Sequence, residues 1–422
     1  MKNIFREKIL NILLFFLIII IPLQTRYFFY TSKIENIFFE YGTIAIYLTD
    51  IYILFFIIYL LIYNFKNKLF KFNNRIKTFF ILLTIFNISL NISLIQSINK
   101  NISLYFNIRF FILSIFVFLL SFTKINKNIF KDGFIYSSFF EACIAIYQFA
   151  DQKIIANKFL GLSNHFPYDL GTSVIENING RLLRSYGLLT HPNILGIFLL
   201  IGFIFLFIKM LNQDNKKYLN YFLLGVIFIG IILTFSRTVF LMLLIFFIIF
   251  FVYKIKNKDF KKNDIYKLSI IFFIIFSNLF IFKNLIFTRI SDNRLNNISN
   301  SERSNQYLES INVIKDNFFF GVGERNYTLY ILDKNQSNDP YIKPVHNIYL
   351  LALCELGLFG FIIFILLTML PLYIKQSLDI KIIYFLILVS GLFDHFLLTE
   401  NFGLFIIIFF LGMMFINTNK DV

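Results

Sequence analysis

Residues 187–208 read GLLTHPNILGIFLLIGFIFLFI, a run without lysine, arginine, aspartate or glutamate. An apolar helix of about 20 residues is long enough to cross the hydrocarbon core of a membrane. Similar runs occur at about 9–23, 41–63, 78–97, 105–122, 134–151, 219–235, 238–253, 268–282, 347–370, 382–398 and 402–416. The sequence therefore predicts an all-α polytopic membrane protein with about 12 transmembrane helices, forming a single integral membrane domain over residues 1–422.

The composition of the chain agrees with this class and excludes others. Hydrophobic residues make up 58% and charged residues 15% of the chain, whereas soluble domains average about 45–50% and about 25%. The formal net charge of +16 is typical of basic cytoplasmic loops in membrane proteins, so we expect contact with membrane lipids and no nucleic-acid partner. Both cysteines, Cys143 and Cys354, lie in apolar runs, which predicts no disulfide, metal or thiol-nucleophile site.

The charges between the runs predict the orientation. Lys2, Arg6 and Lys8 precede the first run as in a signal peptide, but no small-residue cleavage site follows it, so we expect an uncleaved helix. With the N-terminus inside, the cytoplasmic connections and tails hold more than half of the 40 lysines and arginines. This bias follows the positive-inside rule and predicts a cytoplasmic (inner) membrane protein with both termini cytoplasmic.

Two of the predicted outer connections are long. Residues 152–186 form the first long extracytoplasmic loop and residues 283–346 the second; loops of this length are usually functional or disordered. In the second loop, Ser301 followed by Glu302 and apolar residues at helical spacing predicts an amphipathic helix with Ser301 as its N-cap. The turn Gly321-Val322-Gly323 is expected to end it.

Histidine and arginine gather on the predicted outer side. All four histidines lie there, in or beside outer loops, and the cytoplasmic loops rely almost entirely on lysine. Arginine binds phosphate oxygens with two parallel hydrogen bonds, so this asymmetry predicts an outer face that holds an anion. The alternative is that the arginines bind lipid headgroups. The outer arginines are Arg26, Arg181, Arg184, Arg237, Arg289, Arg294, Arg303 and Arg325.

Two arginine motifs stand at helix starts. Arg181, Arg184 and His191 precede Pro192, a residue that suits the first turn of a helix. The free amides there favour a phosphate ligand. Arg237 lies in the tight hairpin between the seventh and eighth runs, at the edge of the bilayer, where its charge needs a partner or an anionic ligand. Interfacial anchoring is the alternative for both motifs.

A third motif, Lys343-Pro344-Val345-His346-Asn347, leads into the tenth run. A helix N-terminus disfavours the imidazolium, so His346 should be largely neutral near pH 7. Such an imidazole can act as a general base; it can equally cap the helix. Glu355 lies within the same run, and Asp394, His395 and Glu400 flank the last outer turn. Acids in the membrane are functional candidates, and the alternative is structural pairing with arginine.

Taken in order along the chain, these motifs resemble those of a known protein family. The chain has the element Gly187…His191-Pro192-Asn193, then Ser236-Arg237, then a long outer loop with Glu302-Arg303, Gly321-Val322-Gly323 and His346-Asn347, running into Glu355-Leu356-Gly357-Leu358-Phe359-Gly360. The ordered set resembles the bacterial O-antigen ligase and O-antigen polymerase family (Wzy-type), over about residues 180–365 in detail and the whole chain in topology.

The resemblance implies a GT-C-like membrane glycosyltransferase. Such an enzyme moves a glycan from an undecaprenyl-pyrophosphate carrier to a hydroxyl of a glycan or lipid acceptor at the outer side of the membrane. It implies no metal, no nucleotide sugar and no other cofactor. Arg184 and Arg237 resemble the family's pyrophosphate-binding arginines, and His346 its catalytic histidine. Arg303 is a weaker match to the arginine at the start of the loop helix. The supporting candidates are Arg181, His191, Asn347 and Glu355.

One departure from the family is visible. Where the family commonly has proline before its Gly-x-Gly turn, this chain has Phe318-Phe319-Phe320, which leaves the local geometry of the loop open.

Within the family, a ligase, a polymerase and a protein O-glycosyltransferase share the same donor, and general resemblance favours a ligase. Outside the family, a flippase or transporter has a similar number of helices, but its site usually lies at the midplane in helices broken by glycine or proline. A membrane scaffold is the third alternative, and it has no need of His346 or Arg237.

Overall fold

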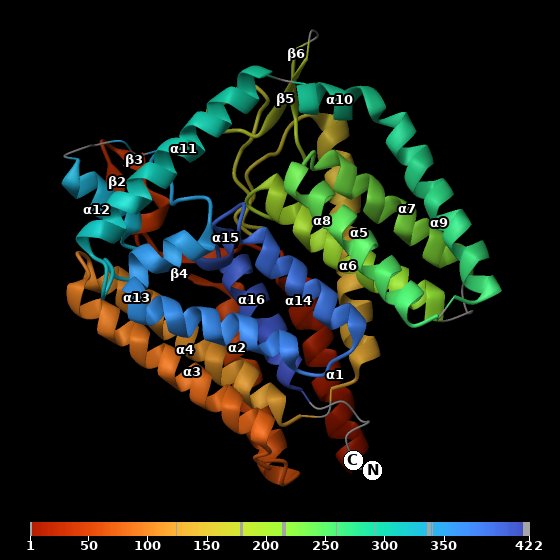
Figure 1. Ribbon diagram of the computed structural model, residues 1–422, viewed down its shortest axis with the longest axis horizontal. Helices are drawn as coiled ribbons and strands as arrows, with labels where there is room; N and C mark the ends of the chain where they lie inside the picture. Colours follow the sequence, from red (N-terminus) through yellow and green to blue (C-terminus); the bar gives the residue numbers. More distant parts are fainter. Residues whose placement is uncertain are drawn as a thin grey trace. The chain divides into compact units, whose positions relative to one another are not determined.

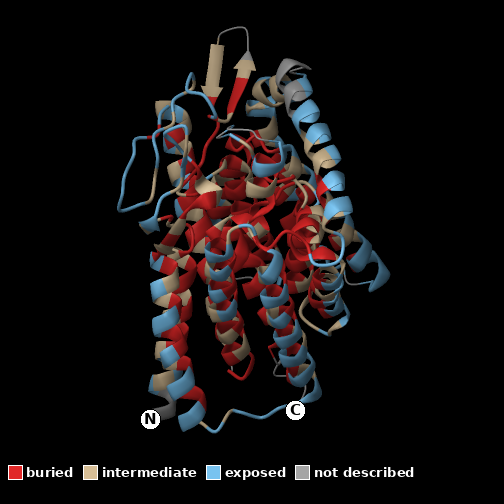
Figure 2. Cartoon of the chain, turned by 90° about the vertical axis from the view of Figure 1, so that its left-hand side faces the viewer, coloured by how far each residue is buried: buried red, intermediate tan, exposed pale blue. Residues whose placement is uncertain are grey.

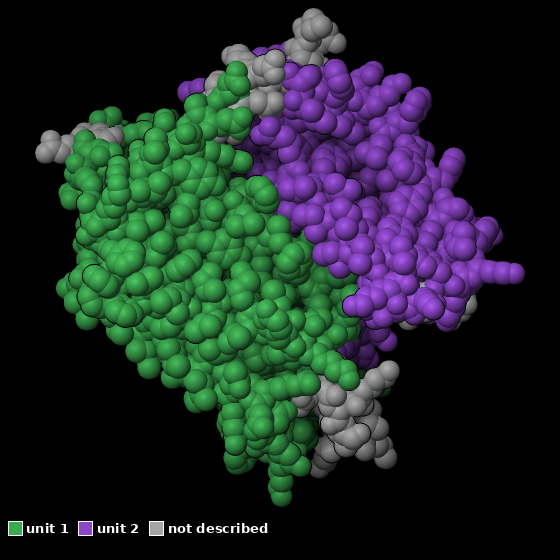
Figure 3. Space-filling model, viewed as in Figure 1, with its two compact units in different colours: residues 1–10, 26–125, 297–422 green, residues 11–25, 126–296 purple. Residues whose placement is uncertain are grey.

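The computed structural model describes residues 2–123, 125–177, 180–212, 217–258, 260–291, 293–335, 339 and 341–416, without the side chains of 2–4, 177, 217, 293–296 and 298–299. The chain divides into two compact units (Figure 3). Unit 1 comprises residues 1–10, 26–125 and 297–422, and unit 2 comprises residues 11–25 and 126–296. Helix α1, Lys2–Ile20, contributes to both.

Unit 1 is built from helices and short strands near the N-terminus and from the last third of the chain (Figure 1). The first residues of its helix α11, 293–296, are assigned to unit 2. The elements are β1 Arg26–Tyr30, β2 Lys33–Ile34, β3 Ile37–Phe38, η1 Glu40–Gly42, β4 Ile44–Tyr47, α2 Leu48–Lys66, α3 Asn74–Ser93, η2 Leu94–Gln96, α4 Lys100–Ser121, α11 Asn293–Asp316, α12 Tyr327–Lys334, α13 Ile348–Met369, η3 Leu370–Tyr373, α14 Leu378–Ser390, α15 Phe396–Thr399 and α16 Asn401–Phe415.

Helix packing in unit 1 joins segments far apart in the sequence. Helix α13 lies along α3, and α16 lies against α4. The rings of Phe79 and Phe415 stack with their centroids 4.2 Å apart, an example of how phenylalanine fills this core. The short strands form separate antiparallel pairs, β1 with β4 and β2 with β3.

Unit 2 is a helical bundle around α6, Pro192–Asn212, which is buried along nearly its whole length. Helices α5, α7 and α8 pack against it (Figure 1). The remaining elements are α5 Lys127–Asp151, β5 Val174–Asn177, β6 Gly180–Leu183, α7 Lys217–Leu233, α8 Arg237–Lys256, α9 Lys262–Ile281 and α10 Lys283–Ser291. Strands β5 and β6 pair as an antiparallel hairpin that leads to the start of α6.

The long helices have the length and composition that a membrane requires. Across the described residues, seven helices qualify as membrane spans. They are 48–66, 74–96, 100–121, 192–212, 237–256, 262–281 and 348–373, and shorter apolar helices cover 218–233 and 401–415. Many helices show exposed residues along one side and buried residues along the other (Figure 2), as lipid-facing helices do. The protein is therefore a polytopic membrane protein, mostly helical as predicted.

Three expected spans differ from this set. The run at 9–23 lies in α1, and the run at 134–151 lies in α5, which begins earlier, at Lys127, and carries charged residues. The run at 382–398 is not one helix: α14 ends at Ser390, and α15 begins only at Phe396. Gly391 and the polar pair Asp394-His395 separate them, which hydropathy alone does not reveal.

The amphipathic loop helix starts earlier than predicted. Helix α11 begins at Asn293, so Ser301 is an interior residue and the prediction of an N-cap serine was wrong. Serine followed by an acid is a start signal only where no helix precedes it. The apolar residues of the predicted helix differ in burial. Val313 is buried and Tyr307 and Ile314 pack beside it, whereas Leu308 and Ile311 are exposed.

Helix α13 is broken at Gly357, whose φ of 65° lies in the left-handed region. In an unbroken helix the N–H of Leu358 would donate to the carbonyl of Cys354. Here Leu358 donates to the carbonyl of Phe318 (2.7 Å), and the N–H of Val322 donates to the carbonyl of Cys354 (3.0 Å). The loop after α11 thus satisfies the backbone groups that the break releases, as apolar surroundings demand.

Candidate functional site

The described site residues fall into an arginine group in unit 2 and a histidine group in unit 1. The arginine group is centred on Arg184, which lies between β6 and α6 and is 5% exposed. Its Nε donates to the carbonyl of Thr234 (2.7 Å), and an NH2 group donates to Oδ1 of Asn193 (2.9 Å). Both acceptors are neutral, so these bonds orient the guanidinium without cancelling its charge.

Two further arginines lie close to Arg184. Burial, together with the cationic groups of Arg289 and Arg237, lowers the pKa of Arg184 to about 9. Arg237 is the first residue of α8 and is exposed, and Ser236 caps the helix by accepting from the N–H of Val239. Arg289 lies in the last turn of α10. Three neighbouring guanidinium groups, one of them at the N-terminus of α8, favour a ligand with several negative oxygens.

Arg181 and His191 have local partners. Arg181 pairs with Glu176 across the β5–β6 hairpin, with Nε and Oε1 3.1 Å apart. The His191 Nδ1 accepts from the N–H of Asn193 (3.1 Å), so the hydrogen is on Nε2, which donates to Ser173 Oγ (2.9 Å). Both ring nitrogens of His191 therefore hold the loop at the start of α6. His165, the other histidine of this loop, stacks on Tyr186.

The histidine group is centred on His346, which lies two residues before α13 and is half-buried. Asn347 caps α13, since its Oδ1 accepts from the N–H groups of Tyr349 (2.9 Å) and Leu350 (3.2 Å). The Nδ1 of His346 lies 2.7 Å from Oε1 of Gln306 on α11. The supporting candidate Asn347 thus fixes the helix end on which the histidine stands.

His395 and Asp394 lie beside His346. The N–H of Ile348 donates to the carbonyl of Gly391 (2.8 Å), which joins the start of α13 to the segment after α14. The rings of His346 and His395 are 4.9 Å apart between centroids. The Thr399 hydroxyl donates to the carbonyl of His395 (3.2 Å) and so accepts from its Nδ1 (2.8 Å), which leaves Nε2 as the basic nitrogen of His395.

Burial and neighbouring charges decide the protonation of the histidine group. Burial is the main cause that lowers the pKa of His346; Asp394 opposes it, and Arg303 and Lys343 add to it. The lowered pKa of His346 agrees in direction with the expectation from the sequence, although its main cause is burial and not the helix dipole. Burial likewise lowers the pKa of His395 to about 3. Both rings are therefore neutral at pH 7, and Arg303 of α11 is close enough to act on His346.

A metal ion was not expected, yet one group has suitable ligands. Among the described residues, His346, Asp394 and His395 each offer a ligand atom, all within 4.8 Å of one another. Two imidazoles and a carboxylate are a donor set that zinc and similar cations accept. The absence of a metal from the reaction therefore remains a prediction.

Glu355, a supporting candidate, is directed at the loop before α12. It is 3% exposed, and its Oε1 accepts from the N–H of Tyr327 (3.5 Å), the first residue of α12. Its carboxyl group also hydrogen-bonds with that of Glu324. Burial, followed by the adjacent Glu355, raises the pKa of Glu324 well above its usual range. These contacts fit a role in holding the loop.

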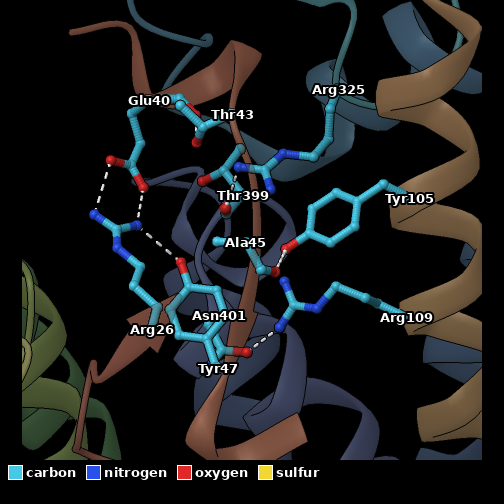
Figure 4. Close-up of polar contacts among 10 residues, drawn as sticks. All are labelled: Arg26, Glu40, Thr43, Ala45, Tyr47, Tyr105, Arg109, Arg325, Thr399 and Asn401. Carbon is cyan, nitrogen blue, oxygen red and sulfur yellow. Dashed lines mark hydrogen bonds and ion pairs between the residues drawn. The ribbon is translucent and has the colours of Figure 1, made fainter. Parts of the chain in front are cut away.

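Other outer arginines have structural partners in unit 1 (Figure 4). Arg26 forms an ion pair with Glu40 and donates to Tyr47 Oη (2.9 Å). Arg325 donates to the carbonyl of Thr399 (2.8 Å). The buried Arg109 of α4 binds Asp50 (3.1 Å) and donates to Oδ1 of Asn401. Arg26 and Arg325, two of the outer arginines, thus have acceptors within unit 1. Arg294, whose side chain lies outside the described residues, is not placed.

Sequence reasoning missed Arg289 and Gln306 as site residues. Arg289 counted only as one of many outer arginines, and Gln306 is one polar residue in a polar helix. One signal was present: Gln306 follows Arg303 by three residues and precedes Ser310 by four, the spacing of one helix face.

The fold and these groups define a multi-pass membrane protein whose arginine and histidine groups stand at helix starts. Residues 221–365 match the Wzy_C family model, described as O-Antigen ligase. This stretch of the chain is therefore an O-antigen ligase family domain, as the motifs predicted. The family is one of membrane glycosyltransferases of the O-antigen ligase and polymerase type, which act on lipid-linked glycans. No curated protein matches the chain.

The matched stretch contains some of the candidate residues and excludes others. Arg237, Arg303, His346, Asn347 and Glu355 fall within it, while the residues of the hairpin and the start of α6 precede it. The excluded candidates are Arg181, Arg184 and His191.

Proposed function

We propose that this protein transfers a glycan from an undecaprenyl-pyrophosphate carrier to an acceptor hydroxyl at the outer face of the cytoplasmic membrane, as an O-antigen ligase of GT-C type does. The observation that carries the proposal is the arginine group. Arg184 is held by neutral oxygens and lies close to Arg237 and Arg289. A diphosphate offers the several anionic oxygens that such a group can bind.

In the proposed mechanism, the arginine group binds the diphosphate and stabilises the charge that grows on it. The acceptor oxygen attacks the anomeric carbon and forms the new glycosidic bond, with inversion, while the bond from that carbon to the phosphate oxygen breaks. The electron pair of the broken bond stays on the diphosphate, where Arg184 and Arg237 stabilise it. His346 takes the proton of the acceptor hydroxyl, a role that its neutral imidazole suits.

The loop elements support recognition in this proposal. Helix α11 carries Arg303 beside His346, where it can bind an anionic oxygen of donor or acceptor. The loops 152–186 and 283–346 are proposed to lie outside the cell membrane and to contact the acceptor, with both termini in the cytoplasm. The reaction so written needs no metal.

A polymerase of the same family is the second candidate, because it uses the same donor. The test is the profile of polyprenyl-pyrophosphate glycans in cells with the gene intact, deleted, or carrying His346→Ala. Long lipid-linked chains that accumulate in both altered strains support a ligase, and single repeat units support a polymerase. A profile altered by deletion but not by His346→Ala contradicts the base assignment.

Transporters and flippases often have broken helices, and α13 is broken at Gly357. Broken helices in transporters expose backbone groups to the substrate. Here the backbone of residues 318–323 forms hydrogen bonds with those groups. The break in α13 therefore anchors the loop after α11 and does not favour a transport site.

A further inference from the structure

Gln306 is held in place on α11 by the packing of its own helix. Ser310, one turn further on, and Val313, two turns further on, are buried. Val313 belongs to a core cluster with Tyr327, Val345 and Leu351. The Tyr327 hydroxyl donates to the backbone carbonyl of Gln306 (3.4 Å). The backbone of Gln306, from which its side chain extends, is therefore held in place.

His346 is equally fixed. It follows the fully buried Val345, a member of the same cluster, and precedes Asn347, the cap of α13. Both partners of the 2.7 Å contact between Gln306 Oε1 and His346 Nδ1 are thus anchored by one core. Because both residues are anchored, this short contact holds the imidazole ring of His346 in one orientation.

The atoms of this contact define the tautomer of the ring. An amide oxygen accepts hydrogen bonds and cannot donate them. His346 must therefore carry its hydrogen on Nδ1 and donate it to Gln306, which leaves the lone pair on Nε2. A neutral imidazole with this arrangement accepts a proton only at Nε2.

We infer that Gln306 is a positioning residue, which holds His346 in the Nδ1–H tautomer so that Nε2 is the nitrogen that takes the acceptor's proton. The inference rests on the proposed function. It also gives α11 a double role, because Arg303 lies on the same face one turn earlier. The loop helix orients the base and places a cation beside it.

A carboxylate at position 306 would act on His346 in a defined direction. The charged and titratable groups that already face the ring are Glu302 and Arg303 of α11, Lys343 of its own loop, and Asp394 and His395 after α14. In Gln306→Glu the acceptor remains at Nδ1 but becomes anionic, which favours the imidazolium. The acid limb of the pH–rate profile should then move to higher pH.

The experiment combines NMR of the histidine ring nitrogens with assays of glycan transfer, both on the full chain in lipid nanodiscs. The probe is undecaprenyl-pyrophosphate glycan isolated from cells that lack the gene. The protein is labelled with 15N-histidine, and His346→Ala identifies the signal of His346. Wild-type protein should show the hydrogen on Nδ1. Gln306→Met, of similar length but without the amide oxygen, should lose this preference and lower kcat by about tenfold or more, a part of the about 10²–10⁴-fold that general acid–base catalysis contributes.

Asn305 provides the matched control, because it is exposed on the same helix. Asn305→Asp adds the same charge one residue away and should leave the tautomer and the acid limb unchanged, whereas Gln306→Glu should retain the tautomer and shift the limb. A shift of equal size in Asn305→Asp would overturn the inference, since the charge alone would then explain it.

The outcomes separate the inference from the proposed function. A hydrogen on Nε2 in wild-type protein overturns the inference, and this measurement needs no variant at position 306. A tautomer and kcat unchanged in Gln306→Met also overturn the inference alone, provided that His346→Ala abolishes transfer. Full transfer by His346→Ala overturns the proposed base itself, whatever the NMR spectrum shows.

Discussion

Arg184 and Thr234 are joined by a 2.7 Å hydrogen bond from the guanidinium Nε to the backbone carbonyl. Thr234 lies in the short link between α7 and α8, just before the capping residue Ser236. The bond therefore ties the segment before α6 to the hairpin that carries Arg237. Two motifs about 50 residues apart in the sequence are brought into one anion-binding group.

The first prediction concerns this group. The double variant Arg184→Ala, Arg237→Ala should lose transfer activity by about 100-fold or more, because each charge-assisted hydrogen bond contributes about 1.5–3 kcal/mol. Transfer of the lipid-linked glycan in nanodiscs measures the loss. Lys262→Ala is the control, since Lys262 is an exposed cation of the same unit at the start of α9, outside the loops proposed to contact the acceptor. Full activity of the double variant would contradict the proposed diphosphate site.

The second prediction concerns pH. The pKa of His346 lies below its usual value of 6.5, and the base works only when neutral. Transfer should therefore be constant through neutral pH and fall as the pH drops through that lowered pKa, so the acid limb lies below pH 6.5. His165→Ala should keep the same limb, because the His165 ring stacks on Tyr186 and is not among the groups that shift the pKa of His346. A limb above pH 6.5, or one that His346→Ala preserves, would contradict this assignment.

The third prediction concerns the break in α13. Gly357→Ala should lower the melting temperature clearly. The left-handed conformation costs about 1–2 kcal/mol for a residue with a Cβ, and a Cβ there would lie 2.4 Å from the backbone of Phe319. Gly225→Ala in α7 is the control. Its Cβ would meet Ile274 at an ordinary 3.5 Å, and alanine favours a helix. Equal effects of the two substitutions would contradict the account of the break.

The fourth prediction separates structural arginines from those of the site. Arg109→Leu should destabilise the protein by about 3–5 kcal/mol, because it leaves Asp50 charged and poorly paired. Arg109→Leu with Asp50→Leu should restore part of the loss. Thermal unfolding of the purified protein measures both. A double variant less stable than the single one would show that the pair is not the main interaction of these residues.

Much of the fold was predictable because membrane burial depends on local composition. The apolar runs identified the seven long helices, and Pro192, Ser236 and Asn347 marked the starts of α6, α8 and α13. The start of α11 was not predictable from Ser301, because the preceding residues 293–300 are polar and asparagine-rich yet helical. Nor does hydropathy show that α14 ends at Ser390.

The candidate site was predictable in its residue types but not in its contacts. Arg184, Arg237 and His346 were recognisable because charged or basic side chains beside apolar runs are costly at a membrane and are therefore functional candidates. Gln306 and Arg289 were not recognisable in the sequence. Only the folded positions of α11 and α10 place Gln306 beside His346 and Arg289 near Arg184. Arg26 was counted only among the outer arginines, and its ion pair with Glu40 of η1 could not be predicted from the sequence.

The junction between the loop after α11 and the break in α13 has a practical consequence for chimeras. Phe319 and Phe320 pack on Phe359, with ring centroids 6.0 Å apart, and residues 318–323 share backbone hydrogen bonds with residues 354–358. The two segments therefore form one structural unit. A loop exchanged with a relative to alter acceptor choice should therefore end before residue 317, or carry the middle of α13 with it.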